Sequence, residues 1–216
     1  MVKQFLRDNP IHKKIVLYFD YFFLLRPTLY FAVWVMVVLG MATAKMNAVN
    51  HPLWITNYDH STFFVFLGIT LLCSGTFIIN QIVDKGSDEK NKKLFLIGQF
   101  IQIKDAQVIS NIISTVGMLF LMIGNLLLTP FGISIYILWG IIYNKPPFEW
   151  KKHHIFGILT NSLIGIILFV MGWLQVTGTS DIQFWKLISL MAPYILCFTA
   201  VSLMTNIPDI KGDESD

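Results

Sequence analysis

Two short acidic clusters are the part of this 216-residue chain best suited to chemistry. In the first, Asn80, Asp84 and Asp88 are spaced four residues apart and would share one face of a continuing helix. In the second, Asp209 and Asp213 repeat that spacing. At the C-terminal end of a helix, the helix dipole and the repulsion between like charges one turn apart both disfavour such carboxylates. A bound Mg²⁺, which prefers carboxylate, water and phosphate oxygens, would relieve both penalties.

A single acidic pair of this kind is also compatible with a solvated turn. The chain has two such pairs, and each follows a long apolar run, which favours a shared metal site over a solvated turn. At the second pair, Pro208 and Gly212 also predict irregular backbone. Irregular backbone at membrane depth is tolerated where it lines a cavity.

The apolar runs that must position these clusters define the class of the protein. Hydrophobic residues make up 55% of the chain and charged residues 13%, whereas soluble domains are about a quarter charged. The mean hydropathy is +0.62. This composition excludes a disordered chain and predicts an all-α, polytopic membrane bundle. The net charge of +3 is too small to indicate nucleic-acid binding, and the two distant cysteines support neither a disulfide framework nor a zinc site.

Six membrane spans are expected from the charge-free runs, each needing about 20 apolar residues. The run at 106–144 is long enough for two spans, with a tight hairpin predicted at the Thr-Pro-Phe-Gly segment 129–132. The runs are residues 27–44, 60–83, 106–144, 153–180 and 187–208.

Lys and Arg predict the orientation of these spans. Fourteen of the sixteen basic residues fall in the N-terminal segment, the loops after the second and fourth spans, and the C-terminal tail, whereas Lys45 and Lys186 fall on the other side. By the positive-inside rule, the N-terminus and both acidic loops are expected to be cytoplasmic. Residues 11–25 are expected to form an interfacial helix leading into the first span.

A third candidate element is the basic loop around residues 143–152. Its paired prolines predict a stiff, extended segment, and its lysines are suited to diphosphate oxygens, although they also serve as topology-setting charges. Within the spans, Asn161 is a candidate substrate-binding residue, with interhelical hydrogen bonding as the alternative. Single aromatic residues such as Trp139 are interpreted as membrane packing.

With these motifs, the chain resembles the UbiA superfamily of intramembrane prenyltransferases over essentially its whole length. The family pattern NDxxDxxxD is matched from Asn80 to Asp88, with Gln81 in place of the first aspartate. The second family pattern, DxxxD in a segment like IPDIEGD, is matched by residues 207–213. The basic loop is similar to the YSAPPLKLK stretch of the chlorophyll-synthase branch at Tyr143, Pro146, Pro147 and Lys151.

The resemblance implies transfer of a prenyl group within the membrane. Mg²⁺ would bind the diphosphate of a prenyl donor, Asn80 would assist, and Lys151 and Tyr143 would donate to diphosphate oxygens. Ionisation would leave an allylic cation, which a hydrophobic, usually aromatic, acceptor attacks. The catalytic, metal-binding residues would be Asp84, Asp88, Asp209 and Asp213.

Family members usually have nine spans, so the six visible here imply a C-terminally truncated chain. We therefore expect a cytoplasmic or interfacial segment at residues 1–26, the transmembrane prenyltransferase domain at 27–208, and the start of the second Asp-rich loop at 209–216. Two other functions remain open: a cation transporter or channel subunit, and an inactive truncated remnant. The transporter is disfavoured because the ionisable residues gather at one interface rather than at the bilayer midplane.

Overall fold

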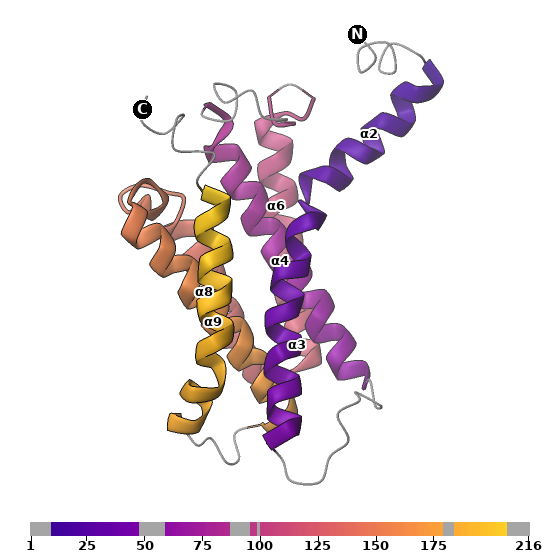
Figure 1. Cartoon of the computed structure of the whole chain (residues 1–216). Helices are drawn as coiled ribbons and strands as arrows, with labels where there is room; N and C mark the ends of the chain where they lie inside the picture. The colour runs from indigo at the N-terminus through magenta and orange to yellow at the C-terminus, as the bar shows by residue number, and fades with distance from the viewer. Residues whose placement is uncertain (1–9, 48–58, 87–95, 99, 179–183, 207–216) are drawn as a thin grey trace.

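A computed structural model describes the fold of most of the chain, and every element in it is helical (Figure 1). The described residues are 10–47, 59–86, 96–98, 100–178 and 184–206. In chain order the elements are α2 (Pro10–Leu24), η1 (Pro27–Leu29), α3 (Tyr30–Asn47), α4 (His60–Val83), α6 (Ile103–Gly124), η2 (Leu126–Leu128), α7 (Thr129–Ile135), the π-helical η3 (Tyr136–Ile142), η4 (Trp150–Lys152), α8 (His154–Thr177) and α9 (Phe184–Asn206).

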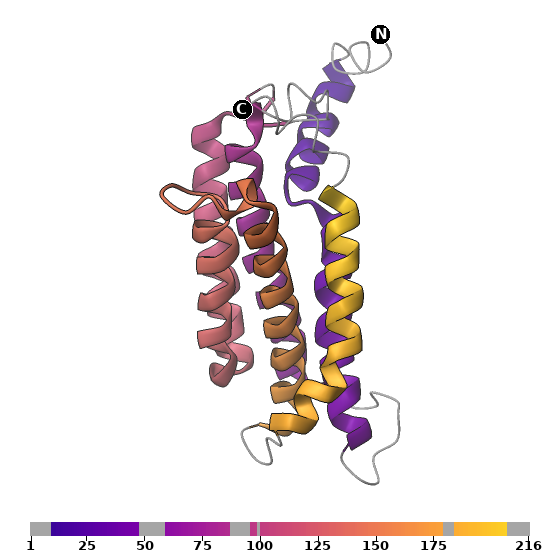
Figure 2. The same cartoon turned by 60° about the vertical axis from the view of Figure 1, so that its left-hand side comes forward.

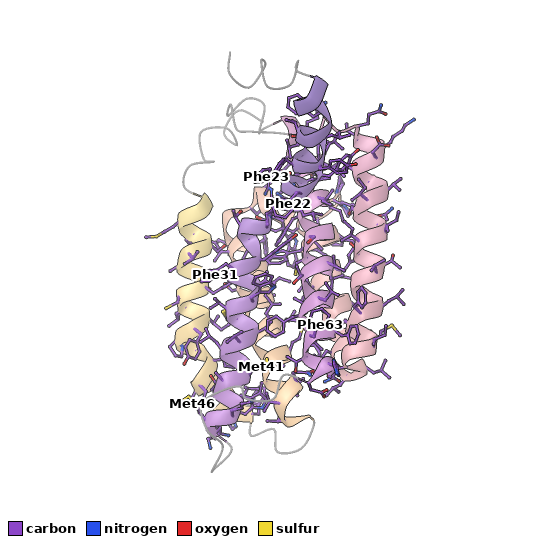
Figure 3. The ribbon with its side chains drawn as sticks, turned by 90° about the vertical axis from the view of Figure 1, so that its right-hand side faces the viewer. Phe22, Phe23, Phe31, Met41, Met46 and Phe63 are labelled. Atoms are coloured by element: carbon purple, nitrogen blue, oxygen red, sulfur yellow. The ribbon has the colours of Figure 1, made fainter. Side chains whose placement is uncertain are left out.

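The predicted polytopic all-α membrane bundle is confirmed. Five helical stretches in the described part of the chain are long and apolar enough to cross a membrane, and the fourth expected span, Leu126–Ile142, is a shorter apolar helix. Large apolar side chains cover the outside, including Phe22 and Phe23 on α2, Phe31 on α3 and Phe63 on α4 (Figure 3). Such a surface is suited to lipid, so the protein is an integral membrane protein.

The predicted hairpin at 129–132 was misplaced, because the turn lies several residues earlier. α6 ends at Gly124, and the chain reverses through Asn125, whose side-chain oxygen accepts a hydrogen bond from the backbone N–H of Leu127 at 3.1 Å. Pro130 then lies in the first turn of α7, where its missing N–H costs nothing. The proline therefore starts a helix here instead of ending one.

Small residues seven positions apart hold α4 and α6 in close antiparallel contact. A Cβ added to Gly117 would lie 2.5 Å from the backbone nitrogen of Leu72, so only glycine fits there. The Ser61 hydroxyl donates to the Gly124 carbonyl at 2.7 Å, and the Ser110 hydroxyl to the Gly75 carbonyl at 2.8 Å. Small residues of this kind let membrane helices approach closely. The facing pairs are Ser61 with Gly124, Gly68 with Gly117, and Gly75 with Ser110.

A second close helix pair joins α3 to α8. A Cβ on Gly40 would meet the Phe169 carbonyl oxygen at 2.0 Å, and one on Gly172 would meet the Val37 carbonyl oxygen at 2.0 Å. α9 runs beside α8 (Figure 2), but most of its described side chains are exposed or half-buried. The described bundle therefore contains two tightly joined helix pairs, α4 with α6 and α3 with α8, whereas α9 leaves most of its described side chains exposed or half-buried.

The helix ends that lead into the two acidic clusters lie at the same end of the bundle. α4 and α9 both finish at the end of the bundle where α8 begins and where η4 lies (Figure 1). This agrees with the expectation that the first acidic cluster, the basic loop and the helix leading to the second cluster share one face of the membrane.

Candidate active site

The first acidic cluster begins at the C-terminal end of α4, and its helix stops earlier than the one-face prediction assumed. The helix ends at Val83, with the backbone N–H of Asp84 donating to the Asn80 carbonyl at 2.8 Å. The Asn80 amide also donates to the Asp84 carboxylate, at 2.6 Å from Nδ2 to Oδ2. Asn80 and Asp84 are thus held together as predicted, whereas Asp88 lies outside the described residues.

Lys151 supplies a positive charge directly to Asp84. Its Nζ pairs with Oδ1 of Asp84, and the two side chains are only 13% and 23% exposed. The neighbouring Lys152 instead pairs with Glu149 at 3.2 Å and is 60% exposed. The structure therefore separates the two lysines, bringing one into the acidic site and leaving the other as a solvated charge.

The turn between η3 and α8 positions Lys151 beside Asp84. Tyr143 caps η3 by donating its backbone N–H to the Leu138 carbonyl at 2.8 Å, and its own carbonyl accepts from the backbone N–H of Lys151 at 3.2 Å. Asn144 is almost fully buried, and its amide donates to the Trp139 carbonyl at 2.6 Å. The segment is thus a folded turn and not the extended segment predicted from its paired prolines, and it brings the backbones of Tyr143 and Lys151 together.

Asn161 lies on α8, where its side chain joins two other helices. Its Oδ1 accepts from the indole N–H of Trp139 at 2.9 Å, and its Nδ2 donates to the Ser202 hydroxyl at 2.7 Å. The observed contacts of Asn161 are therefore interhelical hydrogen bonds, which the sequence analysis gave as the alternative to substrate binding. Its contact with a substrate stays a prediction.

The remaining predicted acids, Asp209 and Asp213, lie outside the described residues, like Asp88. Within the part of the chain that the structure describes, no group of three or more His, Cys, Asp or Glu side chains is arranged to hold a metal ion.

The described residues nevertheless fit part of a Mg²⁺ site. The Asn80 Oδ1 atom is buried and has no hydrogen-bond partner among the described residues, and it lies on the same side chain that binds the Asp84 carboxylate. A buried polar atom without a partner is costly, which makes it a candidate ligand atom. Amide and carboxylate oxygens are hard ligands of the type that Mg²⁺ accepts.

Gln81, the departure from the family pattern, has a structural role that the sequence did not reveal. Its side-chain amide donates to the Leu24 carbonyl at 2.7 Å and to the Phe77 carbonyl at 3.3 Å. Leu24 ends α2, and Arg26, two residues later, adopts a left-handed conformation with φ of 52°. Gln81 thus joins α4 to the junction between α2 and α3.

These features define an integral membrane protein with an oxygen-rich, lysine-paired cluster at one end of an apolar helical bundle. The chain belongs to the UbiA prenyltransferase family, whose model matches residues 33–216.

Curated relatives include protoheme IX farnesyltransferases from Citrobacter koseri, Shigella flexneri and Yersinia enterocolitica, which are 25%, 24% and 25% identical to this chain. Each match extends over 160 residues, which is 72% of this chain and 50% of the relative. The chain thus spans about half the length of the curated relatives it matches. No solved structure matches the chain at a significant level.

Proposed function

We propose that this chain forms the donor-binding part of a Mg²⁺-dependent intramembrane prenyltransferase. The C–O bond of an allylic prenyl diphosphate breaks, and diphosphate leaves with the electron pair. The π electrons of a hydrophobic or aromatic acceptor then form a bond to the allylic carbon, and the acceptor loses a proton. Family membership supports this reaction class, and the apolar bundle is a suitable environment for both lipid-soluble substrates.

The observation that carries the proposal is the cluster of Lys151, Asp84 and Asn80 at the end of α4. A lysine, a carboxylate and an unpartnered amide oxygen meet at the polar end of an apolar bundle. Lys151 pairs with Asp84 in the described structure and is close enough to the same site to donate to diphosphate oxygens instead. Tyr143, joined to Lys151 through the backbone, is the second proposed donor.

Bound Mg²⁺ would supply Lewis-acid neutralisation of the diphosphate, which makes it a better leaving group. Asn80 and Asp84 are the described residues proposed to hold it. Asp88, Asp209 and Asp213 are proposed to complete the ligand set, because their spacing repeats the acidic pattern beside Asp84.

The site is proposed to face the cytoplasm, because the basic loops gather at its end of the membrane. The names of the curated relatives make farnesyl diphosphate the first donor to test and protoheme the first acceptor. A simple phenol is a useful second acceptor because it represents electron-rich aromatic rings in general.

The test is prenyl transfer by the protein in lipid nanodiscs, measured with radiolabelled farnesyl diphosphate and each acceptor. We expect diphosphate release that stops when EDTA is added and returns with excess Mg²⁺. Release of diphosphate that is indifferent to EDTA would contradict the metal assignment. Cation flux into liposomes without diphosphate release would instead favour a transporter.

A further inference from the structure

A cavity of about 350 Å³ lies between α6 and η3, away from the acidic cluster. α7 packs against α6, but η3 continues against α4 and α8, so that α4 contributes the floor of the cavity through Leu72. Leu72 precedes Asn80 by eight residues, which is about 12 Å along a helix. The cavity is therefore separate from the candidate active site. Its lining residues are Leu72, Asn111, Ser114, Thr115, Met118 and Tyr136.

Two polar side chains of this cavity lie near the middle of a membrane span. α6 runs from Ile103 to Gly124, and Asn111 and Thr115 lie on either side of its midpoint, within about 4 Å along the axis. Both side chains are exposed. The hydrocarbon core of a bilayer is about 30 Å thick, so the ester and headgroup oxygens of ordinary lipids are about 15 Å away. The lipid tails at this depth offer no hydrogen-bond partner.

Two hydrogen-bond donors of the cavity have no partner among the described residues. The Asn111 side-chain oxygen accepts from Gln107 at 3.0 Å, which leaves the amide N–H groups of Asn111 available, and the Tyr136 hydroxyl is available in the same way. The Thr115 hydroxyl donates to the Asn111 carbonyl at 2.8 Å and keeps only its capacity to accept. Donors without partners are costly in hydrocarbon, so an acceptor oxygen placed in the cavity would be stabilised.

We infer that this cavity binds a lipid-soluble molecule with a carbonyl oxygen on or between rings, of the quinone or aryl ketone type. The oxygen accepts from Asn111 and Tyr136, and the ring lies over Leu72 beside Met118. The volume suits one small molecule better than a helix about 10–12 Å across. Tyr136 also begins the π-helical η3, and π-helical turns are frequent at functional sites. The inference does not depend on the proposed prenyl transfer.

The test uses a photoreactive ketone, decylbenzophenone, added to the protein in nanodiscs. On irradiation the excited carbonyl takes a hydrogen atom from a C–H bond that it touches, and the two radicals combine. Mass spectrometry then identifies the labelled residues. Competition is measured with a fully substituted decylbenzoquinone, which has carbonyl oxygens, and with decylbenzene, which has the same tail and no oxygen.

We expect saturable labelling at Leu72 and Met118 that the quinone removes and decylbenzene does not. Asn111→Leu and Tyr136→Phe should each raise the quinone concentration for half-maximal competition about 5- to 10-fold, because each variant loses one hydrogen bond. Tyr194→Phe is the matched control, since it removes a hydroxyl from another half-buried tyrosine, on α9 and outside the cavity. It should leave competition unchanged.

A second control moves the amide without changing the composition of α6. The double variant Asn111→Ile, Ile112→Asn places the carboxamide about 100° around the helix, at a position that does not line the cavity. It should weaken quinone competition as much as Asn111→Leu does. Full competition in the double variant would show that polarity anywhere on α6 is sufficient, which would overturn the inference.

Three further results would overturn the inference. Labelling along the whole exposed face of α6 that neither compound competes would show that the probe only partitions into the bilayer. Unchanged competition in both Asn111→Leu and Tyr136→Phe would remove the two donors from any site. A cross-linked dimer that is lost in Asn111→Leu, without quinone competition, would assign the cavity to a second copy of the chain. None of these measurements needs prenyl transfer, so they stand if the proposed function fails.

Discussion

Lys151 and Asp84 form an ion pair across 67 positions of the sequence, at the polar end of α4. Asp84 follows the last turn of that helix, where the helix dipole disfavours a negative charge. Lys151 therefore neutralises the unfavourable negative charge of Asp84, a role that the sequence analysis assigned to a metal ion. A diphosphate entering this site would meet a lysine already held in place by a carboxylate.

Lys151→Met is expected to lower kcat/KM for the prenyl diphosphate about 10- to 100-fold, because a hydrogen bond to a charged group is lost. The matched control is Lys152→Met, which removes the same charge from the adjacent, mostly exposed lysine. Steady-state kinetics with farnesyl diphosphate in nanodiscs would measure both. Equal losses in the two variants would show that the net charge of the loop matters rather than the Lys151–Asp84 contact.

Asp84→Asn and Asp209→Asn are each expected to abolish turnover without preventing membrane insertion. Replacing a carboxylate by a neutral amide removes the charge proposed to hold the metal, at little change in volume. Asp59→Asn is the control, because Asp59 lies exposed at the opposite end of α4. Radiolabel transfer and the amount of folded protein after size-exclusion chromatography are the measurements. Normal turnover in either site variant would remove that aspartate from the metal assignment.

Gln81→Leu is expected to destabilise the protein by about 1–3 kcal/mol, because the buried carbonyl of Leu24 would lose its side-chain donor. Gln81→Asp, which restores the family pattern, should also destabilise, since a carboxylate cannot donate to that carbonyl. Thermal unfolding in detergent would compare both variants with the unmodified protein. A more stable, more active Gln81→Asp variant would show that this position serves the metal rather than the α2–α3 junction.

Gly117→Val is expected to cost roughly 1–3 kcal/mol or more, because its added carbons would meet the backbone of Leu72. Gly157→Ala on α8 is the control, since the nearest atom to an added Cβ there is 3.6 Å away. The melting temperature in a single detergent reports the difference. Similar melting temperatures for the two variants would contradict close α4–α6 contact.

Much of the fold was predictable because the requirement for a membrane span is local. The second expected span, residues 60–83, coincides with α4, and the fifth and sixth spans overlap α8 and α9. The hairpin was misplaced because Pro130 was interpreted as a breaker, although a proline is also favoured in the first helical turn. Whether Pro130 ends one helix or starts the next depends on where the preceding helix ends. That helix, α6, ends at Gly124, and the chain reverses at Asn125.

The sequence by itself determined the membrane class, the approximate spans and the proximity of Asn80 to Asp84, because each depends on residues within one apolar run or one helical turn. Only the tertiary structure decided that Lys151 rather than Lys152 reaches Asp84, and that Gln81 binds Leu24. It also decided that Trp139 and Asn161 link α4 to α9. The physical reason is that these contacts join residues far apart in the sequence, and helix packing sets which polar atoms meet.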